Sequence, residues 1–324
     1  MESRMIGSKI AEGRKKIKIS PAEPAVITTI QSGLQAICED AGLREEANFI
    51  NRAEALDFLD FHIIEQVEGL LQKAGDLESL IALQQQAKEM KLVLDQTDQS
   101  LFRHLREKLS EGNCTPSAFK TLIGPYLGDM ASGGNSIGYD HLDTFLNELL
   151  SDQLLPEETL KREAGMVFYQ KTPARIIWEL AERVAFSQDD LFFDLGSGLG
   201  QVAILVHLLT GVAARGVEYE PAYWYYAQQC ASGLNLPGVQ FLNQDARSCD
   251  YSQATVFFMY TPFDGHMMEE MLTKLRKEAA KRDIRIFTYG PCTFHVAQQE
   301  WLHCEERITS DPYKLYEFST RNKR

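Results

Sequence analysis

The first part of the chain places apolar residues at steps of three and four positions, the spacing of one helix face. The positions on two such faces are Leu56, Leu59, Ile63, Val67, Leu70, Leu80, Leu83, Ala87, Met90, Leu94 and Leu101. Gly75-Asp76 lies between the two runs and predicts the turn of a helical hairpin. Over residues 25–127 we therefore expect an antiparallel helical bundle. We interpret it as a cap on the rest of the chain, and an independent partner-binding bundle is the alternative.

The segments on either side of this helical region are polar. Residues 1–24 are basic and contain two prolines near their end, which predicts a flexible basic arm. Residues 128–138 are rich in Gly and Ser and predict a linker. An amphipathic helix is expected over 139–150 with Asp140 as its N-cap, and a further short helix is expected to begin at Pro156.

After about residue 170 the pattern changes to short apolar runs that alternate with helical segments. The runs 191–195, 213–218, 239–243, 255–260 and 284–289 predict strands, and 173–184, 201–210, 222–232 and 265–281 predict helices. Two last runs, 303–309 and 313–319, predict a closing hairpin with an antiparallel strand. The expected fold class of the domain at 139–324 is α/β, with a Rossmann-like, mostly parallel sheet of seven strands and a helical region before it.

Composition narrows the class of protein. The net charge of −13 opposes binding to phosphate backbones, so there is no strong nucleic-acid signal. The six cysteines are scattered and the histidines show no ligand spacing, so we expect no metal site and a reducing, cytoplasmic location. The basic N-terminal stretch lacks the apolar core of a signal peptide, and no apolar run reaches the roughly 18 residues of a membrane span. The sequence does not indicate an oligomeric state.

The run Asp194–Gly200 reads D-L-G-S-G-L-G and stands between a predicted strand and a predicted helix. Glycines at such a turn let a ligand approach bare backbone at a helix N-terminus. Asp194 precedes the glycines, and a carboxylate there opposes the pyrophosphate of a dinucleotide. A sulfonium cofactor has no phosphate and carries positive charge, so it suits this loop better.

Two further acids follow the next two strands of the predicted sheet. Glu218 can accept hydrogen bonds from ribose hydroxyls, which would also fit NAD. Asp245 can accept from an adenine amine, with the Ala246 N–H reaching a ring nitrogen. Together with Asp194, these acids lie at the carboxyl ends of successive strands and therefore on one rim of the sheet, where ligands bind in open α/β folds.

Over residues 165–320 these features resemble the class I S-adenosylmethionine-dependent methyltransferases, whose cofactor loop is D-x-G-x-G-x-G. The resemblance implies S-adenosylmethionine as cofactor and S-adenosylhomocysteine as product. The residues expected to bind the cofactor are Asp194, Gly196, Ser197, Gly198, Gly200, Gln201, Glu218, Asp245, Ala246, Gln170 and Thr172.

Within that superfamily, the run Asp194–Val202 is similar to the disruptor-of-telomeric-silencing histone-lysine methyltransferases, which also carry helical sequence upstream. The similarity is local. Residues 168–173 lie where that family has a Tyr-Gly-Glu loop, and only Tyr169 corresponds, so lysine specificity does not carry over. Uncharacterised bacterial-type methyltransferases match equally well.

The predicted fourth strand ends in Tyr260-Thr261-Pro262-Phe263, which resembles the [Asp/Asn]-Pro-Pro-[Tyr/Phe] box of nitrogen methyltransferases. Tyr260 replaces the polar first residue of that box and could hydrogen-bond the substrate. Phe263 could form the wall of a methyl channel, or pack in the core. These four residues and Tyr169, as a lid, are the candidate catalytic residues.

The leading hypothesis is a methyltransferase that acts by in-line displacement, for which the protein supplies alignment and desolvation. The acceptor is a protein or other macromolecule, with protein lysine one option; nucleic acid and small metabolites stay open. A cofactor-binding interaction scaffold without transferase activity is the alternative. An NAD-dependent oxidoreductase is a third, against which Asp194 and Asp245 argue.

Overall fold

The computed structural model describes residues 23–74, 78–112, 114–127, 139–187 and 189–320. The chain divides into two compact units, residues 1–99 and 100–324. The division falls within helix α4 (Glu78–Ser110), earlier in the sequence than the predicted linker at 128–138. That linker, the arm up to residue 22 and the predicted turn at Gly75-Asp76 lie outside the described residues.

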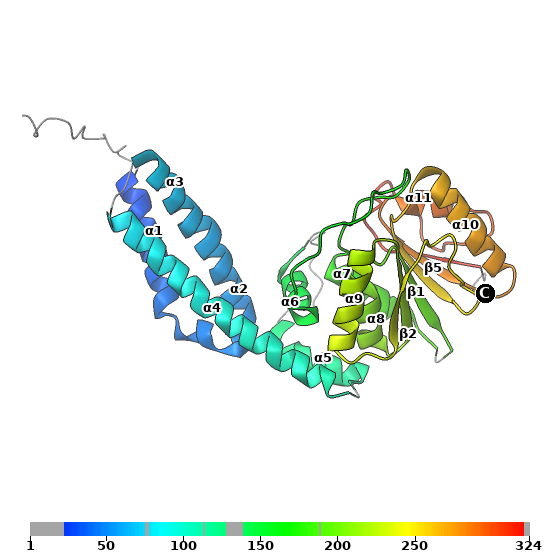
Figure 1. Ribbon diagram of the computed structural model, residues 1–324, viewed down its shortest axis with the longest axis horizontal. Coiled ribbons are helices and arrows are strands. Elements are labelled where there is room, and N and C mark those ends of the chain that lie inside the picture. The colour runs from blue at the N-terminus through cyan, green and yellow to red at the C-terminus, as the bar shows by residue number, and fades with distance from the viewer. Residues whose placement is uncertain (1–22, 75–77, 113, 128–138, 188, 321–324) are drawn as a thin grey trace, which may run out of the picture. The chain divides into compact units, whose positions relative to one another are not determined.

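The first unit is helical (Figure 1). Its elements in chain order are α1 (Glu23–Glu39), two short 3-10 helices (Ala41–Arg44 and Glu46–Asn48), α2 (Phe49–Asp57), a π-helical segment (Phe58–Ile64), α3 (Glu65–Ala74) and the first part of α4. Its core contains most of the expected helix-face positions, namely Leu59, Ile63, Val67, Leu80, Leu83, Ala87, Met90 and Leu94. The interpretation of this unit as a cap stays a prediction.

The second unit begins with helices and continues as an α/β fold. The helices α5 (Pro116–Leu127), α6 (His141–Leu150) and α7 (Ala174–Arg183) precede the sheet. The remaining elements are β1 (Leu191–Leu195), α8 (Gln201–Thr210), β2 (Ala213–Glu218), α9 (Pro221–Gly233), β3 (Val239–Asn243), β4 (Val256–Tyr260), α10 (Gly265–Ala279), β5 (Arg285–Tyr289), α11 (Cys292–Ala297) and β6 (Tyr316–Ser319).

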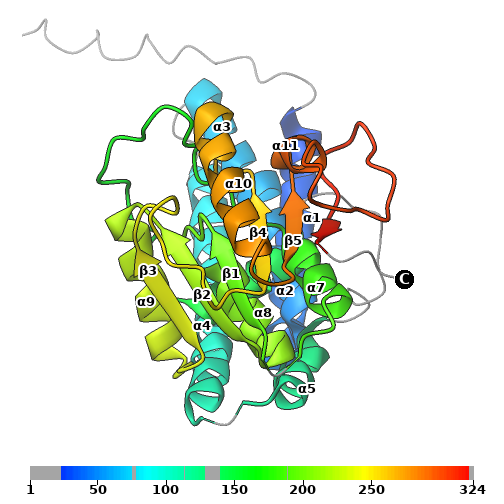
Figure 2. The same ribbon diagram turned by 90° about the vertical axis from the view of Figure 1, so that its right-hand side faces the viewer.

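The sheet confirms the predicted fold class. Its strand order is β3-β2-β1-β4-β5-β6, with parallel pairing throughout except between β5 and β6. Helices α8 and α9 cover one face and α10 and α11 the other (Figures 1 and 2). The chain leaves β1 in one direction toward β2 and β3, and later returns to add β4 on the other side. The carboxyl ends of β1 and β4 therefore flank the switch point at which such sheets bind ligands.

Two local predictions are wrong. Residues 303–309 do not form a strand: His303 makes a single bridge to Ser319, so the described sheet has six strands and not seven. Thr309 instead bonds to the Tyr316 hydroxyl, which takes this segment away from the ladder. The helix expected at Pro156 is also absent. Leu154 and Leu155 beside it are exposed, so a short helix here would have no apolar face to bury.

We call residues 151–173, which join α6 to α7, the strap. The helix before it is as predicted: the Asp140 side chain accepts from the Leu142 N–H, and Asp143 completes a capping box. Asp143 is buried and also accepts from the Ala174 N–H, so one carboxylate fixes the starts of α6 and α7. No described helix has both the length and the apolar character that a membrane crossing requires.

Candidate active site

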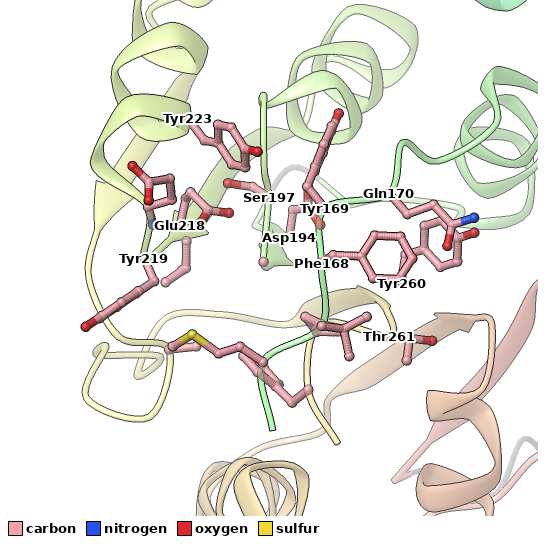
Figure 3. Close-up of a pocket in the computed structure, with 18 of the residues that line it drawn as sticks. Phe168, Tyr169, Gln170, Asp194, Ser197, Glu218, Tyr219, Tyr223, Tyr260 and Thr261 are labelled. Carbon is pink, nitrogen blue, oxygen red and sulfur yellow. Dashed lines mark hydrogen bonds between the residues drawn. The ribbon is translucent and has the colours of Figure 1, made fainter. Parts of the chain in front are cut away.

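A pocket lies over the carboxyl ends of β1, β2 and β4, and the strap forms one of its walls. Figure 3 shows Tyr169 near its centre, with Glu218, Tyr219 and Tyr223 on one side and Gln170 and Tyr260 on the other. The lining includes most of the residues singled out in the sequence, namely Tyr169, Gln170, Thr172, Asp194, Gly196, Ser197, Gln201, Glu218, Asp245, Ala246, Tyr260, Thr261, Pro262 and Phe263. The two other expected cofactor residues, Gly198 and Gly200, are not part of the lining.

The glycine loop makes room for neighbouring side chains. Gly196, Gly198 and Gly200 all have positive φ. A Cβ at Gly196 would come 2.6 Å from the Pro262 Cβ, and a Cβ at Gly198 would overlap the ring of Tyr169. The glycines therefore bring the predicted lid and the β4 box into contact with the cofactor loop.

The Asp194 carboxylate is buried, with an exposed fraction of 3%, and its Oδ2 has no hydrogen-bond partner among the described residues. Burial, and after it the charge of Glu218, raise the pKa of Asp194 to about 8. Burial also raises the pKa of Glu218, whereas the N–H groups of Glu220 and Gly198 that it accepts from act in the opposite direction. A positively charged ligand beside these two acids would favour their ionised forms.

Two more buried polar atoms of the same wall, Ser197 Oγ and Gln201 Oε1, have no partner within the described part of the chain. Buried polar groups of native proteins are nearly always paired, because an unpaired one costs about 1–3 kcal/mol. Together with Asp194 Oδ2, these atoms match a ligand that brings several N–H or O–H donors.

The third acid, Asp245, is already paired. Arg247 Nη2 lies 2.5 Å from its Oδ2. The hydrogen bond from the Arg247 side chain outweighs the effect of burial and holds the pKa of Asp245 below its ordinary value. The same guanidinium contacts Glu163 of the strap at 2.9 Å and Glu270 of α10 at 3.2 Å. Arg247 therefore orients Asp245 and attaches the strap at this end of the pocket. Sequence reasoning missed Arg247, although its position two residues after Asp245 is a usable signal.

The strap is held at two further places. The Glu220 carboxylate accepts from the Thr159 hydroxyl at 2.5 Å and from the Leu160 N–H at 2.8 Å. On the other side, Met166 forms a bridge with Phe263, and the Val167 N–H donates to the Pro262 carbonyl at 3.3 Å. The strap therefore spans the pocket from the β2 edge to the end of β4, although it has no sequence periodicity that would have predicted this path.

Tyr169 extends from the strap into the pocket. Its ring packs against that of Tyr223, with the centroids 5.3 Å apart. The Tyr223 hydroxyl also donates to a carboxylate oxygen of Glu158 in the strap, at 3.3 Å. Burial raises the pKa of Tyr169, so its hydroxyl stays protonated at neutral pH.

At the β4 end, Thr261 has φ +42°, a left-handed conformation that is rare for a β-branched residue. Its N–H donates to Cys292 Sγ at 3.3 Å, and its Oγ1 accepts from the Cys292 N–H at 3.1 Å. Phe263 lines the pocket and also belongs to the core. The Tyr260 ring packs on Tyr289 with centroids 4.8 Å apart, and burial raises the pKa of Tyr260. The Tyr260 hydroxyl therefore stays protonated at neutral pH.

Within the described residues, no three His, Cys, Asp or Glu side chains are grouped so that they could hold a metal ion. The described lining of the pocket includes carboxylates, amides and aromatic rings.

The family model described as "Histone methylation protein DOT1" matches residues 164–236, which run from the end of the strap through β1 and the glycine loop to just beyond α9. No curated protein matches the chain.

Solved structures that resemble the chain include an RNA methyltransferase from Salinibacter ruber in complex with S-adenosyl-L-homocysteine (19% identity, 48% of this chain and 95% of that one, TM-score 0.38). A putative methyltransferase from Escherichia coli is 15% identical over 49% of this chain and 91% of that one, with a TM-score of 0.37. A precorrin-6y C5,15-methyltransferase from Geobacter metallireducens is 13% identical over 48% and 92%, with a TM-score of 0.35.

The strand order, the acids at the ends of β1 and β2 and the family match agree with one another. Over residues 164–236 the chain is similar to the histone methylation protein DOT1, and this stretch contains the glycine loop and the acids at the ends of β1 and β2.

Proposed function

We propose that this protein binds S-adenosylmethionine in the pocket and transfers its methyl group to a macromolecular acceptor, with protein lysine as the first acceptor to test. The observation that carries the proposal is a group of three buried polar atoms without a hydrogen-bond partner in the described part of the chain, namely Asp194 Oδ2, Ser197 Oγ and Gln201 Oε1. A cationic ligand with an ammonium group supplies the donors and the charge that these atoms need. A pyrophosphate supplies neither.

We assign the lining residues to an adenosine end and a methionine end of the pocket. Glu218 is placed to accept from ribose hydroxyls with the oxygen lone pairs that the Gly198 and Glu220 N–H groups leave free. Asp245, its charge balanced by Arg247, is suited to the neutral amine of adenine, next to the Ala246 N–H. Asp194 and Gln201 would hold the methionine end, with Gln170 and Thr172 of the strap beside them.

When bound, S-adenosylmethionine supplies an electrophilic methyl carbon: the acceptor lone pair forms the new bond as the carbon–sulfur bond breaks, and S-adenosylhomocysteine leaves. The protein aligns the acceptor and excludes water. The strap covers the pocket, and Tyr260 and Phe263 form the wall next to the glycine loop. An amine acceptor has to arrive without its proton, or lose it to solvent.

The aromatic groups near Tyr260 support a cationic acceptor. Tyr260 packs on Tyr289, which in turn packs on the partly exposed Tyr313 with centroids 5.8 Å apart. Tyrosine faces attract an ammonium group, and the net charge of −13 favours a basic partner over a phosphate backbone.

Calorimetric titration with S-adenosylhomocysteine tests the cofactor. We expect binding by the unmodified chain and loss of binding in Gly198→Arg, because the new side chain would displace Tyr169. Gly233→Arg is the matched control, since Gly233 ends α9, is exposed and has open space around its Cβ position. Binding of NAD in place of S-adenosylhomocysteine would move the protein to the oxidoreductases.

Transfer of labelled methyl groups into a cell lysate tests the acceptor. Label that protease removes, and that appears as methyl-lysine after hydrolysis, supports the proposal. Label that nuclease removes identifies a nucleic-acid acceptor. Binding without transfer into any fraction favours the scaffold function.

A further inference from the structure

We propose that Asn147 of α6 and Lys171 of the strap are positioning residues that set the polarity of the pocket by fixing the side-chain amide of Gln201. The inference rests on the proposed function, because the polarity concerns the methionine end of the cofactor. Neither Asn147 nor Lys171 belongs to the pocket lining, whereas Gln201 does.

The geometry leaves one arrangement of the amides. Lys171 Nζ lies 2.8 Å from Asn147 Oδ1, and Gln201 Nε2 lies 3.2 Å from the same oxygen. A lysine ammonium can only donate, so the Asn147 atom that faces it has to be the oxygen. That oxygen can accept twice but cannot donate, so the Gln201 atom that faces it has to be the NH₂ group. The chain of donors and acceptors thus fixes both amides.

The consequence appears at the other end of Gln201. With its NH₂ group committed to Asn147, Gln201 presents Oε1 as an acceptor, and this atom is buried without a partner among the described residues. Asp194 Oδ2 is a second such acceptor in the same pocket. If Lys171 no longer fixed Asn147, both amides could turn over, and Gln201 would present an NH₂ group that opposes an ammonium ligand.

Lys171 is held in place by its own contacts. Its backbone carbonyl accepts from the Tyr139 hydroxyl. Burial lowers the pKa of Lys171, and the carboxylates of Asp143 and Glu148 act in the opposite direction and favour the ammonium. The lysine acts through its hydrogen bond to Asn147, which in turn accepts from Gln201, so two hydrogen bonds separate Lys171 from the residue that faces the ligand.

Binding of two ligands can be compared to test the methionine end and the adenosine end of the pocket independently. S-adenosylhomocysteine carries the amino-acid group, whereas 5′-methylthioadenosine has the same adenosine and thioether without it. We expect Asn147→Leu and Lys171→Met to weaken binding of S-adenosylhomocysteine about tenfold, and to leave binding of methylthioadenosine within about twofold. Asn147→Asp is the rescue variant, because a carboxylate accepts from both Lys171 and Gln201 and so preserves the ratio of the two affinities.

The direction of the Lys171→Met effect distinguishes a positioning role from simple repulsion between the lysine and the ligand ammonium. A lysine that merely repelled the ligand ammonium would give tighter binding of S-adenosylhomocysteine when removed, and that result would overturn the proposal. A parallel loss of both ligands without rescue by Asn147→Asp would make the two residues structural only, and would also overturn it.

A Gln201→Met background gives the final check. If Asn147 acts through Gln201, Asn147→Leu should have no further effect on S-adenosylhomocysteine there, whereas a full additional tenfold loss contradicts the coupling. Failure of both ligands to bind the unmodified chain would instead refute the proposed function.

Discussion

The buried carboxylate at the end of β1 should make the protein less stable as pH rises. The unfolded chain loses the Asp194 proton near pH 3.8, and the folded chain loses it only near pH 8. Between these values the folded state binds more protons at Asp194, so the contribution of this group to the free energy of unfolding falls as pH rises and levels off above about 8. At about 1.36 kcal/mol per unit, the roughly three units up to pH 7 correspond to about 4 kcal/mol. Asp194→Asn removes this loss, because the amide stays neutral.

Urea unfolding of the unmodified chain and of Asp194→Asn at pH 5, 6, 7 and 8 measures the effect. The chain's three tryptophans, Trp178, Trp224 and Trp301, all lie in the α/β unit, so their fluorescence reports that unit alone. The advantage of Asp194→Asn should grow by about 1.4 kcal/mol per pH unit until about pH 8. Asp264→Asn is a control, since Asp264 is an exposed N-cap at which Asn also caps well.

Cofactor binding should favour the ionised form of Asp194, whereas folding without ligand favours the neutral form. A cation beside Asp194 favours the carboxylate, so the unmodified chain should release close to one proton on binding S-adenosylhomocysteine at pH 7. Calorimetry in buffers of different ionisation enthalpy measures that proton. Asp194→Asn should bind more weakly and release none from this site. A stability difference that does not change with pH, or binding without proton release, would refute the reasoning.

Three other substitutions probe the walls of the pocket. Gly198→Ala should lower stability by about 1–3 kcal/mol in urea unfolding because its Cβ overlaps Tyr169, and adding Tyr169→Ala should restore part of the loss; no recovery would contradict that contact. Arg247→Met should speed hydrogen exchange across the strap and weaken adenosine binding through Asp245, whereas unchanged exchange would show that other contacts suffice. Thr261→Gly accommodates φ +42° but loses the Oγ1 bonds, so methyl transfer should slow with S-adenosylhomocysteine affinity within about twofold; an equal loss of both would place Thr261 in cofactor binding.

The sequence predicted the central strands well because their patterns are local. The bounds of β1, α8, β2 and β3 agree with the predictions, since continuous apolar runs and glycine turns delimit them. The strap could not be predicted, because it has no periodicity and its path depends on distant partners. Glu220, for example, holds Thr159, which is 61 residues away in the sequence.

In the candidate site, too, some features could be predicted from the sequence and others could not. The glycine loop and its acids were identified from residue type and spacing, and the structure places Asp194, Glu218 and Asp245 in one pocket. Their electrostatics were not accessible from the sequence. The burial that raises the pKa of Asp194, and the Arg247 contact that lowers that of Asp245, act in opposite directions on two residues of the same kind. Only the packed structure distinguishes them.

The pocket-wall atoms that have no partner among the described residues also bear on inhibitor design. An inhibitor that merely fills the space beside Asp194, Ser197 and Gln201 would leave their polar atoms buried and unmatched. It would therefore gain less affinity than its contact area suggests, because each unmatched atom retains its desolvation cost. A smaller compound that offers two well-placed N–H donors to Asp194 and Gln201 should bind more tightly than a larger apolar one. For this pocket, inhibitor affinity should depend more on well-placed donors than on size.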